Sequence, residues 1–143
     1  MSPDASTPAA SNSKAHWLVL AGVLAALGVA AGAFGAHGLR SRVSPEQLEW
    51  WQTAARYHQI HTLALLLVAW IPGPWPRLRS LVAGAFVFGV LIFAGTLYAM
   101  ALGGPRILGA ITPLGGLSLI LAYLGIAKLG WDARSHSKKS GSA

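Results

Sequence analysis

Four apolar stretches, each long enough to cross a lipid bilayer, dominate this sequence. A helix rises about 1.5 Å per residue, so about 20 apolar residues span a hydrocarbon core of about 30 Å. The chain is 54% hydrophobic and 10% charged, whereas a typical soluble domain has about 25% charged residues. We therefore predict an all-α fold, a four-helix transmembrane bundle with short loops and disordered termini.

The expected organisation is one membrane domain, residues 17–130, between two tails. Residues 1–16 are rich in Ser, Ala, Pro and Thr, and residues 131–143 are basic and polar. Such segments bury too little apolar surface to fold, so both tails are predicted to be disordered. The four helices are expected at residues 17–37, 45–71, 80–102 and 106–128.

The start of the second helix carries a distinct signal. Ser44 precedes Pro45 and Glu46, and Gln47 follows. Ser at the N-cap with Gln three residues later forms a capping box, and Pro fits the first helical position. A run of Pro and Gly at residues 72–74 should end this helix.

The first apolar stretch has an alternative interpretation as a signal peptide, because small residues near Gly35 and Ala36 resemble a cleavage site. The stretch is longer than a usual signal core and follows a long polar leader, which favours a retained helix.

Basic residues near the ends of the stretches predict the topology. One side would hold seven of them and the other four, and the richer side is normally cytoplasmic. The seven are Lys14, Arg77, Arg79, Lys128, Arg134, Lys138 and Lys139, and the four are Arg40, Arg42, Arg56 and Arg106. Both termini are therefore expected in the cytoplasm, with the chain in the bacterial inner membrane.

Composition also excludes several function classes. The chain has no cysteine, which removes disulfides, thiolate catalysis, Cys-ligated zinc and iron–sulfur clusters. Its net charge is +7, but the basic residues lie in short clusters between apolar stretches, which suits anionic lipid headgroups better than nucleic acid. No catalytic constellation is visible, so we expect a non-enzymatic protein without a cofactor, with membrane lipids as partners.

The second helix carries polar residues at a depth where lipid would penalise them. Counting back from Ile71 puts Arg56 inside the hydrocarbon and His61 near its midplane. Because an ionisable group there costs about 2.5–3.5 kcal/mol on insertion scales, both side chains should face protein or water. The alternative for Arg56 is that its long side chain reaches the headgroups.

Residues of the other helices fall at a similar depth and complete a hypothetical polar pocket in the non-cytoplasmic half. Its members are His37, Arg56, His61, Tyr98 and Thr112. Pro113 leaves a carbonyl without its usual helical partner, which adds a polar group nearby. Such a pocket would bind a lipid headgroup, a small anion or a membrane protein partner.

Two other functions stay open. His58 and His61 lie three residues apart and would be the ligands in a haem- or metal-binding redox subunit, although no further ligand is evident at that depth. A small transporter would use the break at Pro113 as its gate, but four helices without an inverted repeat are few for that role.

Small residues on the first helix indicate close helix packing. Gly28 and Gly32 lie four residues apart, with Gly35 near them, and this spacing lets helix backbones approach each other. They would form either the seam of a homo-oligomer or a contact within the chain. The second is favoured because a four-span bundle offers internal partners.

Three segments in order resemble the small inner-membrane protein family related to transmembrane protein 256, the domain of unknown function 423. They are Gly32–Leu39 (GAFGAHGL), Thr53–His61 (TAARYHQIH) and Ile111–Gly116 (ITPLGG). The chain differs from the family pattern at His58, where Gln is expected, and at Ala122-Tyr123, where Gly-Trp is expected. The resemblance implies four helices in the bacterial inner membrane and no established activity.

Overall fold

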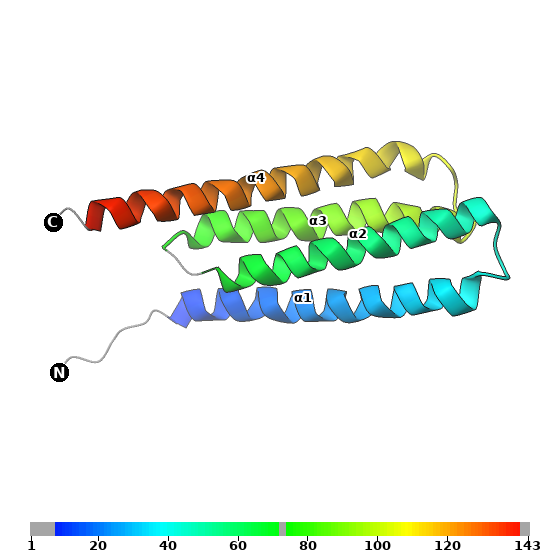
Figure 1. Ribbon diagram of the computed structural model, residues 1–143, viewed down its shortest axis with the longest axis horizontal. Helices are drawn as coiled ribbons and strands as arrows, with labels where there is room; N and C mark the ends of the chain where they lie inside the picture. Colours follow the sequence, from blue (N-terminus) through cyan, green and yellow to red (C-terminus); the bar gives the residue numbers. More distant parts are fainter. Residues whose placement is uncertain (1–7, 72–73, 141–143) are drawn as a thin grey trace.

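The computed structural model describes residues 8–71 and 74–140, which form four long helices, each antiparallel to the next (Figure 1). Helix α1 covers Pro8–Phe34 and passes directly into a π-helical turn, η1, at Gly35–Leu39. Helix α2 covers Pro45–Trp70, α3 covers Pro76–Ala101 and α4 covers Leu108–Ser140. The described part of the chain is thus all-helical, as the sequence predicts.

Both terminal helices extend into segments for which the sequence predicts disorder. α1 begins at Pro8 instead of residue 17, and α4 continues to Ser140 instead of ending near residue 128. Once a helix has nucleated, each further residue adds a hydrogen bond, so a polar segment without a breaker can continue it. An ion pair between Lys128 and Asp132, four residues apart, supports the extension of α4. The expected disorder of residues 1–7 and 141–143 lies outside the described residues.

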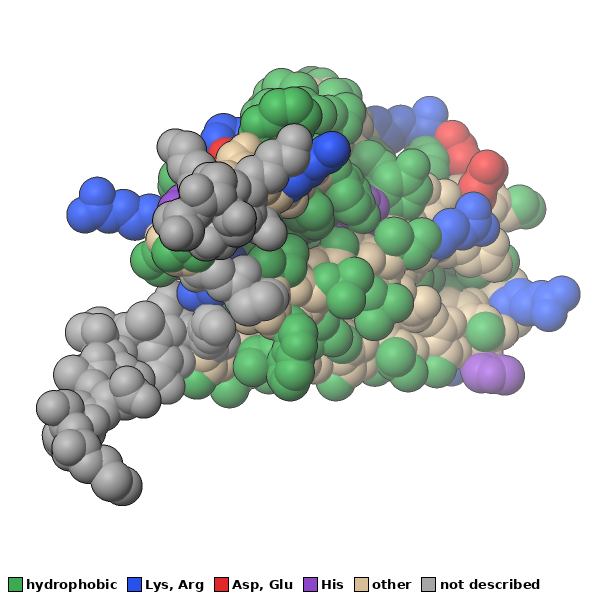
Figure 2. Space-filling model, turned by 60° about the vertical axis from the view of Figure 1, so that its left-hand side comes forward, with side chains coloured by type: hydrophobic (Ala, Val, Ile, Leu, Met, Phe, Trp, Pro, Cys, Tyr) green, Lys and Arg blue, Asp and Glu red, His purple; other side chains and the backbone are tan. Residues whose placement is uncertain are grey.

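Helices that are adjacent in the sequence are also adjacent in space. α1 packs on α2, α2 on α3 and α3 on α4, whereas α1 makes few contacts with α3 (Figure 1). The largest fully buried side chains come from α2 and α3 and form the centre of the core: Phe86, Leu65, Val68 and Thr62. Figure 2 shows hydrophobic side chains over the middle of one face, with charged side chains toward its two ends.

Three helical segments are long and apolar enough to cross a membrane: Ala15–Leu39, Pro76–Ala101 and Leu108–His136. α2 is as long as α3 but falls short of the others in hydropathy, because Arg56, His58, Gln59 and His61 occupy its middle. The expected fourth span is therefore not supported by the composition of α2 alone.

The predicted capping box at the start of α2 is confirmed. The Gln47 amide donates to Ser44 Oγ at 3.2 Å, and the Ser44 amide donates to Gln47 Oε1 at 3.0 Å. Beside it, exposed Glu46 pairs with Arg106 from the α3–α4 loop at 2.9 Å. The guanidinium of Arg106 also lies 5.7 Å from the ring centroid of Trp50. These contacts tie the α3–α4 loop to the start of α2.

α3 and α4 approach each other closely through glycines. A Cβ at Gly115 would collide with the backbone of Phe93, and a Cβ at Gly89 would lie 2.6 Å from Leu119 Cδ2. Helix α4 continues through Pro113. Thr112, which precedes it, donates to the Leu108 carbonyl at 3.1 Å.

Candidate binding site around His58

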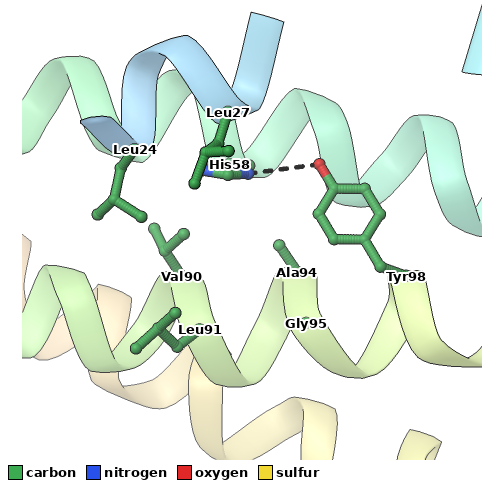
Figure 3. Close-up of a pocket in the computed structure, with 8 residues that line it drawn as sticks. All are labelled: Leu24, Leu27, His58, Val90, Leu91, Ala94, Gly95 and Tyr98. Carbon is green, nitrogen blue, oxygen red and sulfur yellow. Dashed lines mark hydrogen bonds between the residues drawn. The ribbon is translucent and has the colours of Figure 1, made fainter. Parts of the chain in front are cut away.

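His58 lies near the middle of α2 and is 7% exposed. Its Nδ1 lies 3.4 Å from the Tyr98 hydroxyl of α3 (Figure 3). The next turn of α2 begins with Thr62, whose hydroxyl donates to the His58 carbonyl at 2.7 Å. The imidazole itself lies between residues of α1 and α3 (Figure 3).

A cavity of about 140 Å³ lies beside this imidazole, between α1, α2 and α3 (Figure 3). Its lining residues are Leu24, Leu27, His58, Val90, Leu91, Ala94, Gly95 and Tyr98. Leu27, Leu91 and Gly95 are exposed, so they form the mouth. Because α1 barely contacts α3, the mouth opens sideways through the apolar surface of the bundle.

His58 Nε2 is buried and, within the described part of the chain, has no hydrogen-bond partner. The Leu24 carbonyl faces the ring but does not complete a hydrogen bond to Nε2. An unpaired buried polar group costs about 1–3 kcal/mol. The cavity thus combines an apolar wall with one unused hydrogen-bonding atom.

His61 has different surroundings, although it is also 7% exposed. Its Nδ1 lies 2.6 Å from the Tyr57 carbonyl. Its ring centroid lies 5.7 Å from that of Tyr123 on α4 and 6.4 Å from that of Phe86 on α3. His61 therefore belongs to an aromatic cluster beside α4 and not to the cavity at His58.

The structure does not gather the five residues of the predicted polar pocket around one cavity. His37 and Arg56 are exposed. The Thr112 hydroxyl lies 2.7 Å from that of Thr96, on the α3–α4 contact. Tyr98 lines the cavity with His58, whereas His61 lies in the aromatic cluster. Arg56 does not need burial to avoid lipid, since a long side chain can reach the headgroups.

The glycines of α1 face α2 within the chain. A Cβ at Gly28 would lie 3.2 Å from Gln59 Cγ, and one at Gly32 would lie 2.9 Å from Gln59 Nε2. The Gln59 amide donates to the Gly28 carbonyl at 2.8 Å. The small residues therefore let a polar side chain of α2 reach the backbone of α1.

Gly35 lies at the junction of α1 and η1, against Trp51. A Cβ there would be 2.5 Å from Trp51 Cδ1. The Trp51 indole donates to the Ala31 carbonyl at 2.8 Å, and its ring lies 4.5 Å from that of Tyr98. Trp51 thus links the end of α1 to the residue that lines the cavity.

The sequence alone suggests His58 only as a metal or haem ligand and does not predict its contact with Tyr98. Among the residues that the structure describes, no three His, Cys, Asp or Glu side chains gather closely enough to hold a metal ion. The available signal was helical periodicity. Counting in turns puts Ala54, His58, Thr62 and Leu65 along one side of α2, and all four are buried.

The relatives of this chain are membrane proteins. The UPF0382 membrane protein YwdK of Bacillus subtilis is 38% identical over 110 residues, which cover 76% of this chain and 89% of the relative. The UPF0382 membrane protein SSP2132 of Staphylococcus saprophyticus is 39% identical over 108 residues, covering 76% and 90%. A UPF0382 membrane protein of Haemophilus influenzae is 31% identical over 122 residues, covering 85% and 98%.

No solved structure matches the chain. The family model described as "Protein of unknown function (DUF423)" matches residues 31–116, which include the segment of α2 with His58 and Gln59. Together with the relatives, this match means that the chain belongs to the DUF423 family of membrane proteins.

Proposed function

We propose that the chain crosses the inner membrane four times, with both termini in the cytoplasm. α1 and α3 are each apolar enough to span, and α2 runs the length of the bundle between them, joined by short loops (Figure 1). We expect α2 to cross as well, because it links two candidate spans that run in the same direction. Three of its four central polar side chains have protein partners or cover, since His58 and His61 are buried and Gln59 bonds to α1, whereas Arg56 is exposed.

We further propose that the protein is a non-enzymatic binding protein that takes up a small neutral molecule from the bilayer. The observation that carries this proposal is the unpaired Nε2 of His58 beside the cavity between α1 and α3. Pockets for small molecules are mostly apolar, with a few placed polar groups. The cavity at His58 has this character.

The position of the mouth favours a ligand that is dissolved in the hydrocarbon. Leu27 and Leu91 flank it with exposed apolar side chains, near the middle of the candidate spans. A charged lipid headgroup would find no basic side chain there, since Arg56 and His37 are exposed elsewhere on the surface. The proposed site at His58 therefore lies near the centre of the membrane, whereas the pocket expected from the sequence lies in the non-cytoplasmic half.

The test uses a small phenyl diazirine dissolved in nanodiscs that contain the purified protein. Photolabelling of the cavity should saturate with excess unlabelled phenyl compound, whereas labelling of lipid-facing residues should not. Gly95→Leu should abolish the saturable fraction, because a Cβ at Gly95 projects into open space at the mouth.

Gly22→Leu is the matched control. It adds the same side chain at another open position that does not line the cavity, and the saturable fraction should persist. Labelling that never saturates in the unmodified protein, or that saturates equally in Gly95→Leu, would refute the binding function.

A further inference from the structure

We propose that the ligand presents a hydrogen-bond-accepting oxygen to His58 Nε2, and that it is a neutral single-ring compound with a carbonyl group and an apolar tail. A benzoquinone ring is one chemical example. This inference rests on the binding function proposed above and adds to it the polarity and the size of the ligand.

The two neighbours of the imidazole favour one of its two neutral tautomers. A neutral imidazole has one donor and one acceptor nitrogen, and the neutral form is favoured in the membrane interior. The Tyr98 hydroxyl at Nδ1 can donate or accept, whereas the Leu24 carbonyl that faces the ring can only accept. Both are accommodated when Tyr98 donates to Nδ1 and the proton lies on Nε2.

With that tautomer, Nε2–H is a donor without an acceptor. The Leu24 carbonyl does not complete the bond, and the other lining residues apart from Tyr98 and His58 present apolar side chains or Gly. An oxygen that accepts this hydrogen bond would remove the cost of the unpaired group. A ligand whose only polar group is a donor would not remove it.

The volume of the cavity limits the ligand to about one ring. It measures about 140 Å³, and an apolar cavity of about 150 Å³ in a protein core binds benzene. Haem and a phospholipid headgroup are both far larger. An attached tail would leave through the mouth past Gly95, where a side chain would meet no other atom, and continue between Leu27 and Leu91 into the lipid.

Charged ligands are disfavoured by the same walls. No Lys or Arg and no acidic side chain is among the residues that line the cavity. A buried charge without a partner is far more costly than a buried neutral polar group. A carbonyl oxygen satisfies the donor without bringing a charge into the bilayer.

The experiment compares three compounds with the same alkyl tail: decylbenzoquinone, decylphenol and decylbenzene. Each is titrated, as a mole fraction of the lipid, for displacement of the phenyl diazirine from the protein in nanodiscs. Decylbenzoquinone should displace it best, and decylbenzene should bind about tenfold more weakly, the factor that corresponds to 1.4 kcal/mol.

Two substitutions test the role of the imidazole. His58→Leu should lower the affinity for decylbenzoquinone to that for decylbenzene and leave the decylbenzene titration unchanged. His58→Gln keeps an N–H donor at this position and should retain a preference for the quinone. Thermal unfolding of each variant in detergent checks that it is folded. If His58→Leu does not fold, His58→Gln is compared with the unmodified protein instead.

The outcomes separate the two proposals. If all three compounds displace the label equally in the unmodified protein, or if decylphenol binds better than decylbenzoquinone, the ligand class is refuted and the binding function stands. If none of them displaces the label and labelling never saturates, both proposals fail.

Discussion

His58 and His61 are buried to the same extent on successive turns of α2, yet they belong to different contacts in the bundle. His58 lies against Tyr98 and the cavity beside α1, whereas His61 lies against Tyr123 of α4. The two imidazoles therefore have different neighbours in the bundle. Their polar atoms serve two independent contacts, and a substitution of one should leave the other in place.

Reporter fusions test the membrane topology. Fusions at both termini and in the loop before Arg77 should report a cytoplasmic location, and a fusion near Arg42 should report the opposite side, because basic residues are more numerous on the first side. A C-terminal reporter on the non-cytoplasmic side would contradict the four-span arrangement. It would mean that α2 does not cross or that the first segment is removed.

Gly32→Leu should destabilise the contact between α1 and α2. Because a Cβ at Gly32 already lies 2.9 Å from Gln59 Nε2, the larger side chain must displace Gln59 from the Gly28 carbonyl. We expect a loss of about 1–3 kcal/mol in the free energy of unfolding, as for other overpacked sites, measured by titration with a denaturing detergent. Gly22→Leu meets nothing within 4 Å and should be close to neutral. Equal effects of the two would show that Gly32 does not face a helix.

Gly115→Ala should separate α3 from α4. The added Cβ would collide with backbone atoms of Phe93, which cannot move aside as a side-chain end can. The free energy of unfolding should fall by about 1–3 kcal/mol. The neighbouring Gly116→Ala is the control, since its Cβ would make an ordinary contact at 3.7 Å with the Phe93 ring. That change should be neutral or stabilising by up to about 1 kcal/mol, the helix propensity difference between Gly and Ala.

Trp51→Phe should cost about 1 kcal/mol, the net value of a typical hydrogen bond. The substitution removes the indole donor to the Ala31 carbonyl and keeps an aromatic ring beside Tyr98. Trp70→Phe at a position that is 77% exposed should change stability much less. The prediction fails if the two variants unfold at the same detergent concentration.

The helices of this protein could be predicted from local signals, and the pocket could not. Ser44 and Gln47 form their cap without help from other helices. The cost of a charge in lipid predicts that Arg56 faces the bundle, but the periodicity of one helix says only which residues share a side. Which side meets a neighbour depends on how α1 and α3 pack, and they cover His58 and leave Arg56 exposed.

The pairing of His58 with Tyr98 joins residues 40 positions apart. No pattern within either helix specifies that distance, since it depends on the crossing of α2 and α3. The glycines of α1 were more informative, because a lack of side chains permits close approach whichever helix arrives. In the structure that helix is α2, which reaches them through Gln59 and Trp51.

The weak hydropathy of α2 has a consequence for biogenesis. Alone in the bilayer, α2 would expose its imidazoles and the Gln59 amide to hydrocarbon, whereas α1 supplies the acceptor for Gln59 and α3 supplies the hydroxyl for His58. If α2 spans the bilayer as proposed, its stable integration requires the helix made before it and the helix made after it. During synthesis, the second segment should leave the insertion machinery only after the third has emerged, so that the bundle enters the lipid as a group of helices.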